Sequence, residues 1–307
     1  AWWGPAVALV GGGGRPGVRG RAGVVGKGGV VRGGGAVHGR RPGPAGLGRG
    51  LGWVTQYWYA ARVVDLAQGA VAVGVGSALL PVISRDAAER HWDAFRSHFG
   101  EAARLAGLVM LPAAALLLAL APPIVALLFR HGAFDVGAAG HTSATLRALV
   151  PFMLALAGIN IVKKAFFALD DRNSLLAVGV LGLAATAGLG YPLSRSLGVQ
   201  GLGLSLSLSS SLQLALYLMI LRRKMGTQLG LQNLVAPLLR MLAAAVPAAL
   251  VALTICRAGE WEKGPASPLN WALLVAAGVA AGVVYLGGAW ALGVRELRSG
   301  VGRRPPS

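Results

Sequence analysis

LAQGAVAVGVGSALLPVI, residues 66–83, is an apolar run without a charged residue. QYWYAARVVDL, residues 56–66, leads directly into it and places Arg62 and Asp65 three residues apart, on one face of a helix. The run is close to the ~20 residues that a helix needs to cross the ~30 Å hydrocarbon core of a bilayer. Because a helix satisfies its own backbone hydrogen bonds in lipid, this stretch predicts a transmembrane helix with a charge pair at its start.

The rest of the chain repeats this pattern. Apolar residues make up 55% of the sequence and charged residues only 13%, a composition that favours an integral membrane protein over a soluble one. We predict an all-α membrane protein of about seven transmembrane helices, at 66–83, 105–128, 146–169, 175–197, 199–221, 234–256 and 271–294. The APP sequence at 121–123 predicts that the second span ends in a broken or re-entrant turn.

Lysine and arginine alternate between the connections as the positive-inside rule requires. Fifteen lie in one set of connections and five in the other. This bias predicts a cytoplasmic C-terminus and places residues 56–62 at the external face. Much of the net charge of +18 therefore reflects membrane topology, and we expect no nucleic-acid partner.

Residues 1–50 differ from everything after them. They are rich in Gly and Arg, contain no Asp or Glu, and show neither period 2 nor period 3.6. They could form a disordered basic arm for anionic headgroups or nucleic acid; we favour a GC-rich coding region read in a shifted frame, because the segment lacks Ser, Gln and Glu. The predicted division is a low-complexity segment, 1–50, and a membrane lobe, 51–307.

Two further patterns predict local structure. In the connection 84–105, apolar residues at 88, 92, 95, 99 and 102 form one helical stripe, which predicts a separate helix on the cytoplasmic surface or a solvated linker helix. Asp86 and Arg90 are spaced for an i,i+4 ion pair. In the fifth span, small and polar residues recur every four residues, which favours close helix packing over the polar wall of a transport cavity; they are Gly201, Ser205, Ser209 and Gln213.

Charged residues at membrane depth are costly and often mark function. The candidates are Arg62 and Asp65, and the pair Lys163 and Lys164. Arg62 suits a phosphate, but it could equally anchor the helix at the interface beside the aromatic residues 57–59. For the two lysines, snorkelling to the interface is the favoured interpretation. With one cysteine, Cys256, and no clustered histidines, we expect no metal site, no cofactor and no catalytic residues.

Several ordered segments resemble one known family. YAARVVDLAQGAVAVGVGSALLPVISRDAA (59–88) is similar to the signature of the MurJ/MviN lipid II flippases. LLFRHGAFD (127–135), KKAFFALDDRNS (163–174) and LGVQGLGLSLSLSSSLQLALYLMILRRK (197–224) resemble the same family in the same order. The resemblance implies the C-terminal lobe of a fourteen-helix flippase of the bacterial inner membrane. Such a flippase moves lipid-linked peptidoglycan precursor to the external leaflet by alternating access between two lobes.

The resemblance also implies roles. Arg62 would contact the diphosphate of the lipid substrate, with Asp65 as its neighbour, and the last two spans would cradle the lipid tail. The missing N-terminal lobe would be the partner, so we expect a truncated fragment. Departures from the family are Ala61 and Ala67, and Thr186 and Gly190, which stand where Asn or Asp is common and make a sodium site unexpected.

Two alternatives stay open at this point. The chain could flip another polyprenyl-linked saccharide, which the sequence does not distinguish from lipid II. It could also be a non-transporting membrane scaffold whose basic tail, residues 1–50, binds anionic lipid. The scaffold hypothesis predicts that Arg62 is dispensable.

Overall fold

The structure is a computed structural model, and it describes residues 44–74, 79–130, 136–225 and 232–294. Within these ranges every regular element is helical, as predicted for an all-α protein. In chain order the elements are α1 (Pro44–Gly74), α2 (Leu79–Ala88), α3 (Trp92–Phe129), α4 (Val136–Ala168), α5 (Arg172–Leu197), α6 (Val199–Met225), α7 (Gln232–Cys256), the 3-10 helix η2 (Trp261–Ala266) and α8 (Pro268–Ala291).

Six helices, α3 to α8, are long and apolar enough to cross a bilayer. They correspond to the last six predicted spans, which are confirmed as helices. The first predicted span, 66–83, is described in two parts: α1 covers it as far as Gly74 and α2 from Leu79, while residues 75–78 lie outside the described residues.

The start of α1 also differs from the prediction. Most of the low-complexity segment predicted over 1–50 lies outside the described residues. Residues 44–50 are described and are helical, so the boundary predicted at residue 51 falls inside α1. Pro44 opens the helix, a position where its fixed φ and missing N–H cost nothing.

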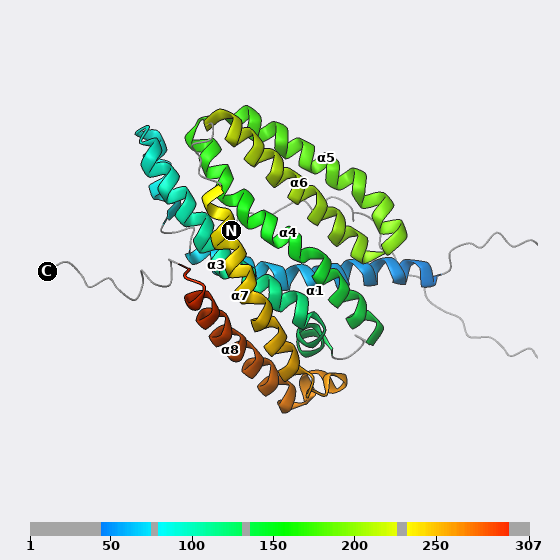
Figure 1. Ribbon diagram of the computed structural model, residues 1–307. Helices are drawn as coiled ribbons and strands as arrows, with labels where there is room; N and C mark the ends of the chain where they lie inside the picture. Colours follow the sequence, from blue (N-terminus) through cyan, green and yellow to red (C-terminus); the bar gives the residue numbers. More distant parts are fainter. Residues whose placement is uncertain (1–43, 75–78, 131–135, 226–231, 295–307) are drawn as a thin grey trace, which may run out of the picture. The chain divides into compact units, whose positions relative to one another are not determined.

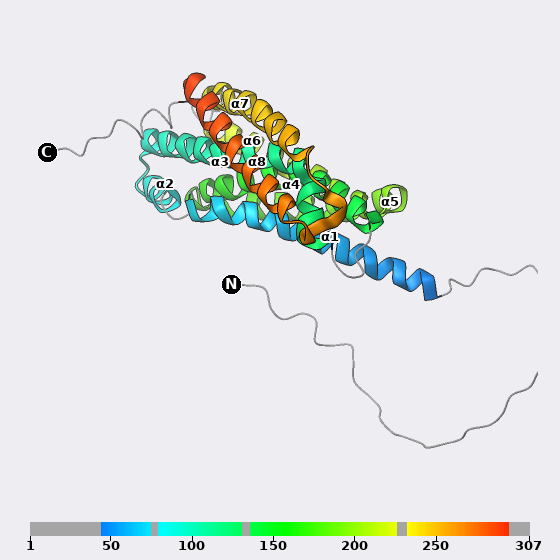
Figure 2. The same cartoon turned by 90° about the horizontal axis from the view of Figure 1, so that it is seen from below.

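The helices pack in layers. α4 packs most extensively against α6, and α6 in turn pairs with α5. α3 contacts both α4 and α7, and α7 pairs with α8. Figures 1 and 2 show α1 on one side of α3 and α4, with α7 and α8 on the opposite side.

The predicted surface helix over 84–105 is wrong as a separate element. Its first part belongs to α2, and its second part is the beginning of α3, which continues without a break into the membrane span. The apolar stripe is confirmed in part: Phe95, Phe99 and Ala102 are buried, whereas Ala88, at the end of α2, is exposed. No helix-stop signal separates the stripe from the apolar run, so one helix of 38 residues, about 57 Å long, contains both.

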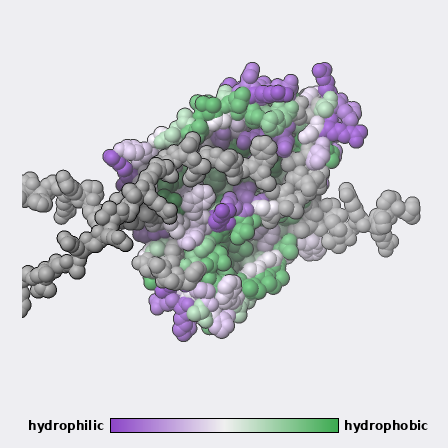
Figure 3. Space-filling view, turned by 180° about the vertical axis from the view of Figure 1, so that it is seen from behind, coloured by the Kyte–Doolittle hydropathy of each residue, from purple (hydrophilic) through white to green (hydrophobic). Residues whose placement is uncertain are grey.

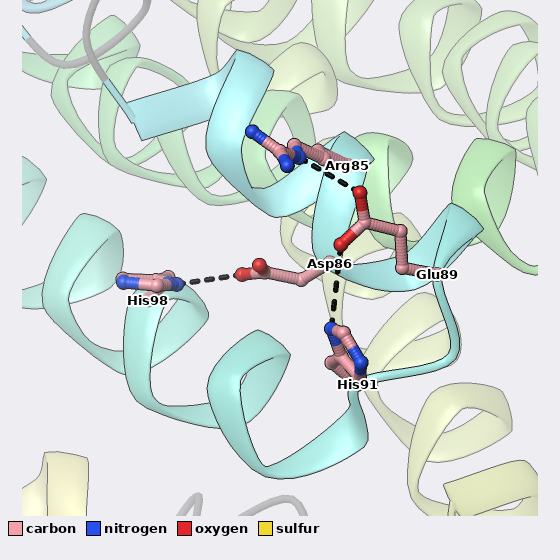
Figure 4. Close-up of polar contacts among 5 residues, drawn as sticks. All are labelled: Arg85, Asp86, Glu89, His91 and His98. Atoms are coloured by element: carbon pink, nitrogen blue, oxygen red, sulfur yellow. Dashed lines mark hydrogen bonds and ion pairs between the residues drawn. The ribbon is translucent and has the colours of Figure 1, made fainter.

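Polar contacts hold the corner between α2 and α3 (Figure 4). Asp86 Oδ2 lies 2.6 Å from His98 Nδ1 of α3, and Glu89 contacts Arg85 at 2.8 Å and His91 at 3.3 Å. The predicted Asp86–Arg90 pair is absent from the described ion pairs, because Arg90 lies past the end of α2 in a left-handed turn with φ 57°.

The predicted break at 121–123 is also wrong, because α3 continues through Pro112, Pro122 and Pro123 to Phe129. A proline has no N–H, so it leaves unpaired the carbonyl four residues earlier. For Pro122 that carbonyl belongs to Leu118, and Arg147 Nε of α4 donates to it at 2.9 Å.

Pro112 frees the carbonyl of Leu108 in the same way. The hydroxyl of Tyr285, from α8, donates to that carbonyl at 2.8 Å. Side chains from other helices therefore replace two of the hydrogen bonds that prolines remove from α3. This is why a helix that would break in water continues in a membrane protein.

The alternating LSLSLS sequence of α6 follows from its position between two helices. The face that carries Ser205 and Ser209 points to α5, where Ser209 Oγ lies 2.7 Å from Thr186 Oγ1. The opposite face points to α4, where Ser207 Oγ donates to Ala148 O and accepts from the Phe152 N–H. The Ser207 hydroxyl is therefore inserted into the backbone ladder of α4, next to Pro151.

The surface matches a membrane protein. Figure 3 shows one face on which hydrophilic residues gather at opposite ends, with a largely apolar band between them that a small hydrophilic patch interrupts. Large apolar side chains are exposed along α5, among them Leu176, Val180 and Leu183. Exposed apolar side chains of this kind are what lipid requires of a spanning helix.

Candidate functional site

α1 positions Arg62 and Asp65 through its buried edge. Ala60, Val63 and Val64 pack into the core, so the intervening Arg62 and Asp65 are exposed on the outer face. The prediction that the two share a helix face is confirmed. Among the described residues, no ion pair joins them.

One aromatic residue of α1, Trp58, lies beside the Arg62 side chain. The guanidinium carbon of Arg62 lies 6.0 Å from the ring centroid of Trp58, one turn earlier in α1. A cation–π contact at an exposed site contributes about 0.5–1 kcal/mol, enough to bias the rotamer without occupying the N–H donors. Tyr59 stacks on Phe129 of α3 at 4.4 Å and fixes this end of α1 against the bundle.

The resulting arrangement can bind an anion. A guanidinium presents several N–H donors in a planar fork that matches the oxygens of a phosphate. The ring of Trp58 lies near it, and Leu66, exposed one turn later, keeps the neighbouring surface apolar. Asp65 carries the opposite charge on the same face.

Lys163 and Lys164 lie elsewhere. They are half-buried near the end of α4, and Gln68 of α1 donates to Met153 O of α4 at 2.6 Å. Lys163 follows Met153 by ten residues, about 15 Å along α4, whereas Arg62 precedes Gln68 by about 9 Å along α1. Both helices run from right to left in Figure 1, so the two displacements lead away from each other, and the structure does not bring the lysines and Arg62 into one site.

The acids after these lysines pair with other residues. Asp171 Oδ2 lies 2.5 Å from Lys224 Nζ of α6, and its Oδ1 accepts from the Ser174 N–H at the start of α5. The Lys224 contact, helped by Ser174, lowers the pKa of Asp171. Asp170 pairs with Arg172. These two acids thus hold the α4–α5 turn and α6 together.

Sequence patterns missed three residues that the structure makes important. Gln68 joins α1 to α4, Ser207 enters the ladder of α4, and Arg147 binds a carbonyl of α3. Among these contacts, only that of Arg147 could have been expected from the sequence. Pro122 lacks an N–H, so the carbonyl four residues earlier, that of Leu118, needs another donor.

The polar face of α6 favours the packing interpretation. Gly201, Ser205 and Ser209 are buried against α5, and Gln213 Nε2 reaches Val178 O at 3.4 Å. A Cβ added to Gly201 would lie 2.0 Å from Leu193 O, so this glycine allows the two backbones to touch.

The fold and the spans define a multi-pass α-helical membrane protein with one exposed arginine at the start of the lobe. A family model described as lipid II flippase MurJ matches residues 51–270. The chain therefore belongs to the MurJ family. This membership and the six apolar helices make it a multi-pass protein of the bacterial inner membrane.

Individual relatives agree. The chain is 27% identical over 259 residues to the lipid II flippase MurJ of Burkholderia cenocepacia, covering 81% of this chain and 48% of that protein. It is 29% identical over 152 residues to a probable lipid II flippase MurJ of Synechocystis sp., covering 49% of this chain and 28% of that protein. The chain thus spans at most about half the length of these relatives.

A solved structure shows the same fold. The lipid II flippase MurJ in an inward closed conformation matches with a TM-score of 0.60 and 18% identity, over 77% of this chain and 46% of that one. The interpretation of the fold as one lobe of a larger flippase agrees with this coverage.

Proposed function

We propose that this chain is the C-terminal lobe of a lipid II flippase and that Arg62 binds the diphosphate of the lipid-linked precursor. A second lobe supplies the facing half of the cavity, and substrate moves from the cytoplasmic to the external leaflet by alternating access. The movement changes no covalent bond, so the chain acts as a transporter and not as an enzyme. Asp65 orients Arg62 in this proposal.

The exposed position of Arg62 carries the proposal. Helix α1 turns its small apolar residues into the bundle and its arginine outwards, where Trp58 lies 6.0 Å away. An arginine with a purely structural role would be expected to bind a carboxylate or a backbone carbonyl of the bundle, as Arg147 and Arg130 bind carbonyls. Arg62 instead presents its donors at a surface that a second lobe or a substrate headgroup can meet.

Lys163 and Lys164 take a different part. Their half-buried position near the end of α4 suits a cation that snorkels to the cytoplasmic interface. There they would attract an anionic headgroup before it enters the cavity. We propose no cofactor, and coupling to an ion or to the membrane potential follows from no residue described above.

The test measures binding of lipid II to the purified chain in detergent. Arg62→Ala removes the guanidinium, and the expected loss of affinity is about tenfold, the lower end of what a charge-assisted hydrogen bond contributes. Arg62→Lys keeps the charge without the fork and should lose less.

Arg195→Ala is the matched control. Arg195 is also an exposed arginine stacked on an aromatic residue of its own helix, with its guanidinium carbon 4.5 Å from the Tyr191 ring. If Arg62→Ala and Arg195→Ala weaken binding equally, Arg62 contributes only general positive charge and the proposal is wrong. Competition with another polyprenyl-diphosphate saccharide decides between lipid II and that alternative substrate.

A further inference from the structure

Helix α4 contains a joint within little more than one turn, residues 148–153. Pro151 lies in this turn and has no N–H, so the carbonyl of Arg147, four residues earlier, loses its partner in the helix. In α3, two carbonyls freed in the same way receive donors from other helices, at Leu118 and Leu108. Among the described residues, no side chain of another helix donates to the Arg147 carbonyl. The defect that is repaired in α3 therefore persists in α4.

The next hydrogen bond of the α4 ladder is altered as well. In a regular helix the Phe152 N–H donates to the carbonyl of Ala148. Here the hydroxyl of Ser207, from α6, accepts from the Phe152 N–H at 3.0 Å and donates to Ala148 O. Ser207 is only 3% exposed, so little water competes for these groups. A side chain inserted into the ladder beside a proline is a known cause of a kink in a helix.

The two halves of α4 are tied to different helices. On the external side of the joint, Arg147 Nε donates to Leu118 O of α3 at 2.9 Å. On the cytoplasmic side, Gln68 Nε2 of α1 donates to Met153 O at 2.6 Å. The joint itself is bonded to α6 through Ser207. A movement of α1 relative to α3 would therefore pull the two halves in different directions, and the weakest place between them is the joint.

We infer that α4 works as two half-helices that bend at residues 148–153, and that Ser207 and Gln68 are positioning residues for this movement. Ser207 fixes the angle seen here, because it bonds both groups of the altered ladder position. Gln68 transmits a movement of α1 to the cytoplasmic half of α4. Arg62 precedes Gln68 by about 9 Å along α1, so a diphosphate that binds Arg62 would shift the joint, a step that rests on the proposed function.

The experiment uses the whole chain in detergent micelles, labelled with 15N at its seven phenylalanines only. Phe152 lies in the joint, and Phe166, buried further along the same helix, is the internal control. Relaxation dispersion detects movements between microseconds and milliseconds, the range in which helices shift and hinges bend. The Phe152 amide should show dispersion that the Phe166 amide lacks. Absence of dispersion at Phe152, or equal dispersion at both amides, would overturn the inference.

Three variants separate the joint from ordinary packing. Pro151→Ala restores the missing N–H and should lower the population of the minor state at least about twofold, the weakest effect expected of one hydrogen bond. Ser207→Ala removes the bridge and should raise that population by at least about the same factor. Ser205→Ala is the matched control, because this serine is 1% exposed on the same helix and its hydroxyl donates to Leu202 O of α6 itself. If Pro151→Ala changes nothing, or Ser205→Ala acts like Ser207→Ala, the joint is not the source of the movement.

Lipid II tests the link between the joint and Arg62. At a concentration where its binding has been measured, lipid II should shift the Phe152 signal and leave the Phe166 signal in place. Gln68→Met removes the donor and keeps a side chain of similar length, so this variant should bind lipid II without the shift at Phe152. Binding to the parent protein without a shift at Phe152 contradicts the role of Gln68. Absence of binding contradicts the proposed function, whereas the dispersion measured without lipid decides on the joint itself.

Discussion

The hydroxyl of Tyr285 should stabilise the bundle because of a proline in another helix. Tyr285 is 4% exposed, and its hydroxyl donates to Leu108 O of α3. Pro112 cannot donate to that carbonyl, so Tyr285→Phe leaves a buried acceptor without a partner. The expected cost is about 1–2 kcal/mol, because an unsatisfied buried group loses its full solvation.

Tyr217→Phe provides a matched comparison. Tyr217 is 1% exposed, and its hydroxyl donates to Leu175 O of α5 at 2.9 Å. Gly179, four residues later, has an N–H and can still pair with that carbonyl. Removing this hydroxyl should cost only about 0.5 kcal/mol, the usual value for an extra bond between membrane helices.

A double-mutant cycle isolates the proline. Pro112→Ala restores an N–H four residues after Leu108, so Tyr285→Phe in that background should cost no more than about 0.5 kcal/mol. The assay is the free energy of unfolding from SDS titration in mixed micelles, with thermal melting as a second readout. If Tyr285→Phe costs the same with and without Pro112, the freed carbonyl is not the reason that the hydroxyl matters.

Three further predictions concern other parts of the chain. Gly201→Ala should destabilise the protein by about 3 kcal/mol or more, because the added Cβ would lie 2.0 Å from Leu193 O. At Gly188 an added Cβ would have nothing within 4 Å, so Gly188→Ala should stabilise the protein by about 0.5–1 kcal/mol. SDS titration measures both free energies of unfolding, and equal effects would contradict the close approach of α5 and α6. The contact with Lys224 lowers the pKa of Asp171, so the stability that this ion pair contributes is complete above the ordinary pKa of 3.8 and is lost as the pH falls below it. The melting temperature of Asp171→Asn should therefore fall less in acid than that of the parent protein. Parallel acid profiles of the two proteins would show that the ion pair contributes nothing. In a Cys256→Ser background, Ser196→Cys should react with a membrane-impermeant thiol reagent in intact cells, and Ser97→Cys should not. Both positions are exposed, so a difference in labelling reports the side of the membrane. Labelling of Ser97→Cys alone would show that the proposed topology is the wrong way round.

Hydropathy predicted most of the membrane helices because burial in lipid depends on composition and length. It failed where the limit of an apolar run is not the limit of a helix. α3 begins at Trp92 among charged residues, and α1 begins at Pro44, because helical hydrogen bonding continues wherever the backbone can make it. The stripe of Phe95 and Phe99 was predicted correctly but assigned to a separate helix.

The rule that proline breaks helices failed for a different reason. That rule describes a helix in which nothing else supplies the missing hydrogen bond, whereas Arg147 and Tyr285 supply donors to α3. Such partners are far away in sequence, so no local pattern reveals them.

The candidate site was partly accessible from the sequence. The spacing of Arg62 and Asp65 predicted their shared face, and the i,i+4 spacing of Trp58 and Arg62 would have predicted the ring contact. The separation of Lys163 from Arg62 depends on how α1 docks on α4, which the Gln68–Met153 contact fixes. That contact joins residues 85 positions apart, beyond the range of any periodicity.

The two hydrogen bonds that Arg147 and Tyr285 donate to carbonyls of α3 have a consequence for how the protein is made. Helices enter the membrane in the order in which the ribosome synthesises them. When α3 enters, its Leu118 carbonyl needs Arg147 of the next helix, and its Leu108 carbonyl needs Tyr285 of the last. The hydrogen bonding of α3 therefore stays incomplete until α8 has been synthesised. In a chain that stops before α8, water, lipid headgroups or the insertion machinery must provide the donor for the Leu108 carbonyl.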